Sequence, residues 1–144
     1  MPEVSGTFSG RTRLQTAVSL SDVSSHELQL AEITGSHRSA DENWNGAELV
    51  YWGVADLVQG SGTQRGYYEN ERANGDRENG TFEGKVTTAS GQTTLEGTWQ
   101  ATAGTGRFQG LKAQGTYKGR MSSPTEVEMS WEGRYELAGA AQAA

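Results

Sequence analysis

The sequence predicts an all-β fold: a single eight-stranded antiparallel β-barrel with short hairpin turns. Three observations support this expectation. Apolar and polar residues alternate along most of the chain, as they do in strands that have one buried and one solvated face. Clusters of turn residues separate the alternating stretches at short intervals. Apolar residues do not recur at the spacing of an amphipathic helix over three uninterrupted turns.

Four strands are expected in the first half of the chain. They span residues 5–18, 26–34, 47–58 and 63–72. In the first, Phe8 and Leu14 share a parity that points toward the core; in the second, Leu28 and Leu30 do so. The third is apolar on both faces, so the pattern does not decide which face points inward, and the strand could pack between two barrels. The fourth contains two adjacent tyrosines.

Four more strands are expected in the second half, at residues 81–88, 93–102, 113–120 and 125–137. The last has the clearest pattern, because Val127, Met129 and Trp131 share one parity while glutamates occupy the other. A helix would distribute those glutamates around its circumference, whereas a strand places them on one wet face. The strands therefore define one domain, residues 1–137, and we expect the tail 138–144 to be disordered.

Turn residues divide these strands. Asn74-Gly75, Asn79-Gly80 and Ser90-Gly91 supply the positive φ angles that tight hairpins require. Pro124 precedes the last strand, and residues 35–46 form the longest polar loop.

Glycines favour a barrel over the alternative, a β-sandwich. Gly84, Gly97, Gly115 and Gly133 have the parity of the large aromatic residues and are expected to face inward. A small barrel needs this mixture of small and large side chains to bend its strands and fill its interior. The glycines also predict a cavity, because they return volume to the interior.

Composition excludes several classes of function. The net charge is −6, and the 12 Lys and Arg residues are scattered, so we expect no nucleic-acid partner. No apolar run approaches the length of a membrane span, and no secretory leader is visible, so we expect a cytoplasmic protein without a membrane partner. With no cysteine and two histidines, neither a metal site nor a cofactor is expected. A leader that has been removed stays an alternative.

The segment 95–119, LEGTWQATAGTGRFQGLKAQGTYKG, carries a glycine-rich turn followed by an aromatic residue. It resembles the late strands of the allene oxide cyclase-like barrels of the calycin type, which include the dirigent proteins and small uncharacterised bacterial barrels. The resemblance implies a tight turn at Gly104 and Gly106, with Phe108 and Leu111 closing one barrel end. It also implies a homodimer or homotrimer with a hydrophobic cavity. The acidic residues of the dirigent active site have no counterpart here.

The large apolar residues that are expected to face inward are the candidate ligand-binding residues. They are Phe8, Leu30, Phe82, Trp99, Met129 and Trp131. Such a set either lines an apolar pocket or forms the core alone. Tyr117 and Tyr135 share the inward parity, and their hydroxyls are the natural polar points of a pocket.

Glu32 is the acidic residue that could perform catalysis. It shares the parity of Leu28 and Leu30, which would bury its carboxyl group and raise its pKa into the range of a general acid or base. Alternatively, a bulge at residues 31–33 would turn Ile33 inward and Glu32 outward.

These observations predict a cofactor-free barrel that binds an apolar or aromatic small molecule. If it is an enzyme, the reaction suited to such a cavity is cyclisation or isomerisation of a hydrophobic substrate, with Glu32, Tyr117 and Tyr135 as catalytic groups. The alternative is a non-catalytic, lipocalin-like binding barrel or a structural barrel.

Overall fold

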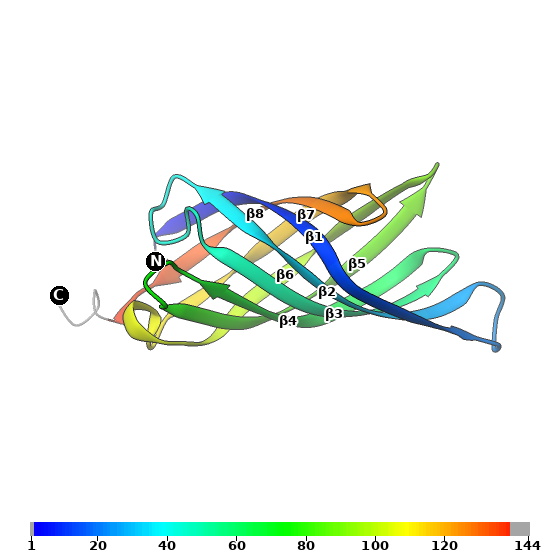
Figure 1. Cartoon of the computed structure of the whole chain (residues 1–144), viewed down its shortest axis with the longest axis horizontal. Coiled ribbons are helices and arrows are strands. Elements are labelled where there is room, and N and C mark those ends of the chain that lie inside the picture. The colour runs from blue at the N-terminus through cyan, green and yellow to red at the C-terminus, as the bar shows by residue number, and fades with distance from the viewer. Residues whose placement is uncertain (1, 139–144) are drawn as a thin grey trace.

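A computed structural model describes residues 2–138 as a closed antiparallel barrel of eight strands (Figure 1). The strands are β1 (Glu3–Leu20), β2 (His26–Ser39), β3 (Glu48–Val58), β4 (Ser61–Glu71), β5 (Arg77–Ala89), β6 (Gln92–Gly104), β7 (Lys112–Ser123) and β8 (Glu126–Glu136). A short 3-10 turn, η1 (Gly106–Phe108), precedes β7. In this part of the chain no helix is long and apolar enough to cross a membrane. The tail predicted to be disordered lies, apart from Ala138, outside the described residues.

Every strand pairs with its neighbours in the sequence, and the ring is closed by β1 and β8. Glu3–Arg11 of β1 pairs in register with Glu126–Arg134 of β8. The predicted barrel is thus confirmed, and the closed hydrogen-bonded ring excludes the sandwich. Each predicted strand is present; β1, β5, β6 and β7 extend beyond both predicted bounds, and β3 and β8 lie within theirs.

Asn79-Gly80 was expected to form a turn, but it lies inside β5. The turn before β5 is made instead by residues 72–76, where Gly75 has a φ of 90°. The register between β5 and β6 shifts at Asn79-Gly80, because Thr102 of β6 is an extra, bulged residue opposite this pair.

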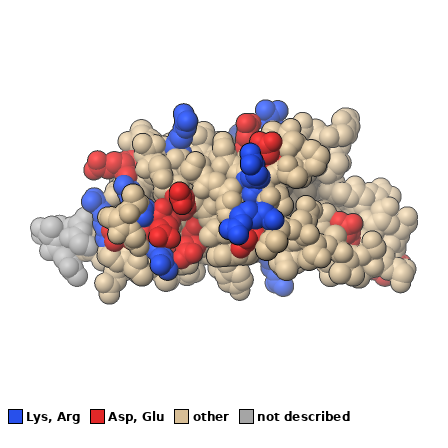
Figure 2. All heavy atoms as spheres, viewed as in Figure 1, with Lys and Arg blue, Asp and Glu red and all other residues tan. Residues whose placement is uncertain are grey.

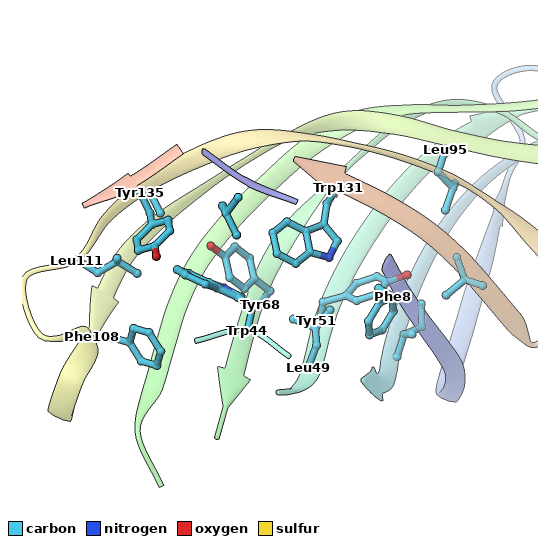
Figure 3. Packing of buried hydrophobic residues seen from close by; sticks show 14 of the residues in the cluster. Phe8, Trp44, Leu49, Tyr51, Tyr68, Leu95, Phe108, Leu111, Trp131 and Tyr135 are labelled. Carbon is cyan, nitrogen blue, oxygen red and sulfur yellow. The ribbon is translucent and has the colours of Figure 1, made fainter. Parts of the chain in front are cut away.

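One end of the barrel is plugged by side chains from two loops. Trp44 comes from the loop between β2 and β3, while Phe108 and Leu111 come from the turn between β6 and β7. All three are buried, and the Trp44 and Phe108 ring centroids are 5.8 Å apart. Figure 3 shows Phe108, Leu111 and Tyr135 gathered at this end, with Phe8 and Leu95 farther along the interior.

Aromatic rings lie over the inward glycines. A Cβ atom at Gly84 or Gly97 would lie 2.6 Å from the Tyr117 hydroxyl, and one at Gly115 would lie 2.7 Å from the Trp99 ring. The glycines therefore let cross-strand aromatic rings lie against the backbone. Most of the volume that they return to the interior is filled by these rings, and the cavity is smaller than the glycines predicted.

Candidate functional site

A cavity of about 90 Å³ lies inside the barrel. Five of the six predicted ligand-binding residues line it, together with Tyr117. They are Phe8, Phe82, Trp99, Met129 and Trp131. The volume falls short of the ~300–1,000 Å³ of an ordinary ligand pocket, so the barrel in this conformation has no room for a large hydrophobic substrate.

The sixth predicted residue, Leu30, and the predicted acid Glu32 are not in the cavity. Leu30 is 51% exposed on the outer face. Glu32 accepts a hydrogen bond from the Trp52 indole nitrogen at 2.7 Å, and its carboxylate lies 3.7 Å from the Arg13 guanidinium. The prediction that Leu30 lies inside the barrel is therefore wrong, and of the two alternatives for Glu32 the structure has the outward one.

The cause is the parity of β2, whose inner face carries Ile33 and His37 instead of the leucines. No bulge is needed to turn Glu32 outward, since the β2–β3 register is continuous from His26 to Ser36. In β1, a register shift between Thr12 and Leu14 reverses the parity and turns Leu14 outward as well.

The other two predicted catalytic residues are inside the barrel but lie in different places. Tyr117 lines the cavity, and its hydroxyl accepts a hydrogen bond from the Gln64 side-chain amide at 2.8 Å. Burial raises the pKa of Tyr117 to about 12. Tyr135 is at the plugged end, where its hydroxyl donates to Asp41 at 2.6 Å. The structure therefore brings Tyr117 to the cavity, and leaves Glu32 and Tyr135 away from its wall.

A cluster of polar side chains that the sequence reasoning missed lines the cavity. We call His37, Tyr68, Asn70 and Glu78 the inner polar cluster. Glu78 is its centre and is 1% exposed. Its carboxyl oxygens accept hydrogen bonds from the Tyr68 hydroxyl at 2.6 Å and from the Asn70 side-chain amide at 2.9 Å. The indole nitrogen of Trp44 approaches to 3.4 Å.

These contacts set the electrostatics of Glu78. Burial raises the pKa of its carboxyl group, because the charged form loses its hydration inside the barrel. The three hydrogen-bond donors oppose that rise but do not cancel it. The Tyr68 hydroxyl, buried beside the carboxyl group, has a pKa well above its ordinary value for the same reason.

His37 extends the cluster toward Trp131. Its Nε2 atom lies 2.8 Å from the Asn70 side-chain oxygen. Because the Asn70 nitrogen donates to Glu78, its oxygen accepts, and His37 therefore carries its proton on Nε2. Burial lowers the pKa of His37 to about 4, so the ring is neutral at pH 7 and its Nδ1 atom is an acceptor.

Two buried polar atoms, in side chains that line the cavity, have no hydrogen-bond partner within residues 2–138. They are His37 Nδ1 and Trp131 Nε1, an acceptor and a donor. The two rings are in edge contact, with centroids 5.3 Å apart, and both side chains line the cavity. His37 is 6% exposed and Trp131 is 8% exposed, so bulk water does not satisfy these atoms.

The alternation of inward and outward residues along β4 and β5 indicates that the missed polar residues face the interior. Residues 69–78 are rich in Glu and Asn, a composition typical of a solvated hairpin tip, and His37 lies in the segment 35–46 predicted to be a polar loop. In β4, however, Tyr68 and Asn70 continue the inward parity of Gln64. Glu78 similarly precedes Phe82 by four residues on the inner face of β5. The predicted strand 63–72 already contains Asn70 on this parity, and extending the strand 81–88 toward the turn would place Glu78 inside as well.

Comparison with known proteins assigns no family, because neither a protein-family model nor a curated protein matches the chain. In the described part of the chain, no group of three or more His, Asp and Glu residues is arranged to hold a metal ion. The function is therefore argued from the inner polar cluster and the cavity beside it.

Proposed function

We propose that the barrel interior binds a small, neutral organic molecule that carries a hydroxyl group. The observation that carries this proposal is a pair of buried, unpartnered atoms in two side chains that line the cavity, His37 Nδ1 and Trp131 Nε1. A hydroxyl group donates one hydrogen bond and accepts others, so a single hydroxyl complements both atoms. The surrounding aromatic rings favour an apolar or aromatic body on the ligand.

Size restricts the ligand to about one ring. An apolar cavity of about 150 Å³ is enough to hold benzene, so a cavity of 90 Å³ must expand to take one ring. Met129 lines the cavity and is a flexible side chain, and we infer that its rotation supplies the further room that a phenol needs. Phenol is therefore a suitable probe, and benzene is its matched control without the hydroxyl.

The experiment is a titration of the protein with phenol and with benzene, followed by amide NMR shifts. We expect phenol to bind about 3- to 10-fold more tightly, the effect of one net hydrogen bond of roughly 1 kcal/mol. Trp131→Phe should remove this preference, whereas Trp99→Phe should retain it because the Trp99 indole already donates to the Thr116 carbonyl. Absence of saturable binding for both probes, or equal affinities in the native protein, would contradict the proposal.

Glu78 favours a second candidate, a cofactor-independent isomerase or cyclase for a small carbonyl compound. A buried carboxyl group with a raised pKa is suited to remove a proton from carbon, and Trp131 could donate to the carbonyl oxygen. Incubation with cyclopentanone in D₂O tests this directly. An isomerase would exchange the protons beside the carbonyl for deuterium, and Glu78→Gln would abolish the exchange. Binding without exchange leaves the non-catalytic, lipocalin-like function.

We also infer kinship with the allene oxide cyclase-like barrels. The support for it is the motif at residues 95–119, the eight-stranded barrel and the burial of Phe108 at the end of the barrel. This kinship would be contradicted if homologues collected by a deeper search lacked the glycine-rich turn at this place in the chain.

A further inference from the structure

The second half of β1 has a free strand edge. Pairing with β8 ends at Arg11, after which the Thr12 amide donates to the Thr125 carbonyl at 2.8 Å. Pairing with β2, on the other side, continues to Leu20. Within residues 2–138, no strand therefore lies beside Arg13–Leu20 on its β8 side. Figure 1 shows this segment, which we call the β1 extension, reaching with β2 beyond the closed part of the barrel.

The β1 extension lacks the features that protect natural edge strands. Its sequence from Leu14 to Leu20, LQTAVSL, contains neither a charged residue nor a proline. Every residue from Arg13 to Ser19 is exposed, so both faces of the strand are open as well as one edge. Exposed strand edges usually carry lysine, proline or a covering element, because their unpaired amides and carbonyls bind other strands.

An apolar surface continues from the β1 extension across the outer face of the barrel. We call it the outer apolar patch; its members are Leu14, Val18, Leu28, Leu30, Trp52, Val54 and Tyr67. The strand register places them on adjacent strands, with Val18 opposite Leu28, Leu30 opposite Val54 and Trp52 opposite Tyr67. In Figure 2, the end of the molecule that contains the β1 extension shows few charged side chains.

The area of this patch is on the scale of a protein interface. Each of its side chains is more than a third exposed, and Leu14 and Tyr67 are about two-thirds exposed. Seven such side chains expose several hundred Å², of the order of the ~800 Å² per partner that a stable complex buries. Glu32, which pairs with Arg13, lies within the patch between Leu14 and Trp52. An apolar patch of this size on a monomer marks an interaction site.

The geometry points to a second copy of this chain as the partner. An open strand edge takes another strand, and residues Leu14–Leu20 of a second copy supply one without charge or proline. Antiparallel pairing about a two-fold axis sets residues of equal parity opposite each other. In the register that sets Leu14 opposite Leu20 of the other copy, Val18 lies opposite Thr16, and the two outer apolar patches lie side by side on the same face of the joined sheet. This pairing closes at two copies, so it makes a dimer.

Sedimentation equilibrium tests the oligomeric state. The native chain of 15.4 kDa should sediment with twice that mass, and Val18→Lys should reduce the mass to that of one chain. Val18 is 60% exposed, so the substitution leaves the fold of the monomer intact. Thr116→Lys is the matched control, because it adds the same charge at an exposed site on β7 outside the patch. A native monomer or trimer, or a dimer that Val18→Lys does not dissociate, would overturn the inference.

Hydrogen exchange distinguishes strand pairing from stacking of two patches. In the dimer, amides of the β1 extension that point away from β2 should be protected, and Val18→Lys should increase their exchange at least tenfold. Thr116→Lys should leave it unchanged. A dimer in which these amides exchange at the rate of an open edge would show that the copies meet in another way. The ligand proposed above plays no part in this inference or its tests.

Discussion

Burial keeps the His37 imidazole neutral, because its charged form would lose hydration among the aromatic rings of the interior. Phe8 and Trp131 both lie against this ring, with centroids 5.4 and 5.3 Å away. Among residues 2–138 the ring has one polar contact, to Asn70, which stabilises the charged form less than burial destabilises it. The folded protein therefore keeps His37 neutral at pH values just below 6.5, where the same side chain in the unfolded chain is protonated.

This dependence predicts that His37 makes the protein less stable in acid. Between pH 6.5 and about 4 the unfolded chain binds a proton at His37 that the folded chain does not, so the free energy of unfolding falls as the pH falls. The full loss is about 3 kcal/mol below pH 4. Urea unfolding of the native protein and of His37→Gln, at pH 7 and pH 4, measures it.

The difference between the two proteins isolates the histidine, because both retain Glu78 and the surface carboxylates. The raised pKa of Glu78 acts in the opposite direction: its cost to stability increases as the pH rises above 4.5. Parallel pH profiles for the native protein and His37→Gln would show that His37 is not held neutral.

At the scale of the element, glycines in the strands leave space in which aromatic side chains pack against the backbone. Gly84 and Gly97 are opposite each other on β5 and β6, and the Tyr117 hydroxyl from β7 lies over both. Glycine ordinarily weakens a strand, since it has no side chain to pack and a large entropy to lose. Here the space that it leaves is used by the tyrosine ring.

Gly97→Ala should therefore destabilise the barrel, although alanine loses less conformational entropy than glycine on folding. The new Cβ atom would lie 2.6 Å from the Tyr117 hydroxyl and closer still to the Glu83 carbonyl oxygen, so the backbone or the ring must shift. We expect a loss of about 1–3 kcal/mol in the free energy of unfolding. Thr98→Ala, at the neighbouring position on the same strand, is the control and should change it by much less. A Gly97→Ala variant as stable as the control would contradict this role.

The alternation of residues was sufficient to predict the strands, because a period of two is visible wherever one face is wet. It was not sufficient to predict which face is inside. In β2 the leucines looked like the core, yet they belong to the outer apolar patch, and this reversed the placement of Glu32. Conversely, Glu78 is a charged residue on an inner face, where composition argues against it. Tertiary packing decides such cases, and a single sequence does not record it.

At the scale of the whole molecule, the barrel is closed by the pairing of the first strand with the last. Glu3 pairs with Arg134, so the ends of β1 and β8 lie side by side, and Figure 1 places the N-terminus at the plugged end with the end of β8. Closure therefore requires that strands from opposite ends of the sequence meet, but it does not require that the chain begin with β1.

A circular permutant should consequently fold into the same barrel. The chain ends would be joined by a short Gly/Ser linker, and the chain would be opened between Ser90 and Gly91, a tight exposed turn in which a Cβ atom at Gly91 would touch nothing. All eight strand pairings survive this rearrangement. We expect a far-ultraviolet circular dichroism spectrum that matches the native one, and a cooperative unfolding transition.

The control permutant is opened at residues 105–111. That cut releases the buried side chains of Phe108 and Leu111 from the plugged end, where Phe108 contacts Trp44. Loss of an aromatic core contact costs roughly 3–5 kcal/mol, so this permutant should be much less stable than the first. Equal stability of the two permutants would show that the plug contributes nothing to closure. Failure of both to fold would show that the barrel needs its native order of strand formation.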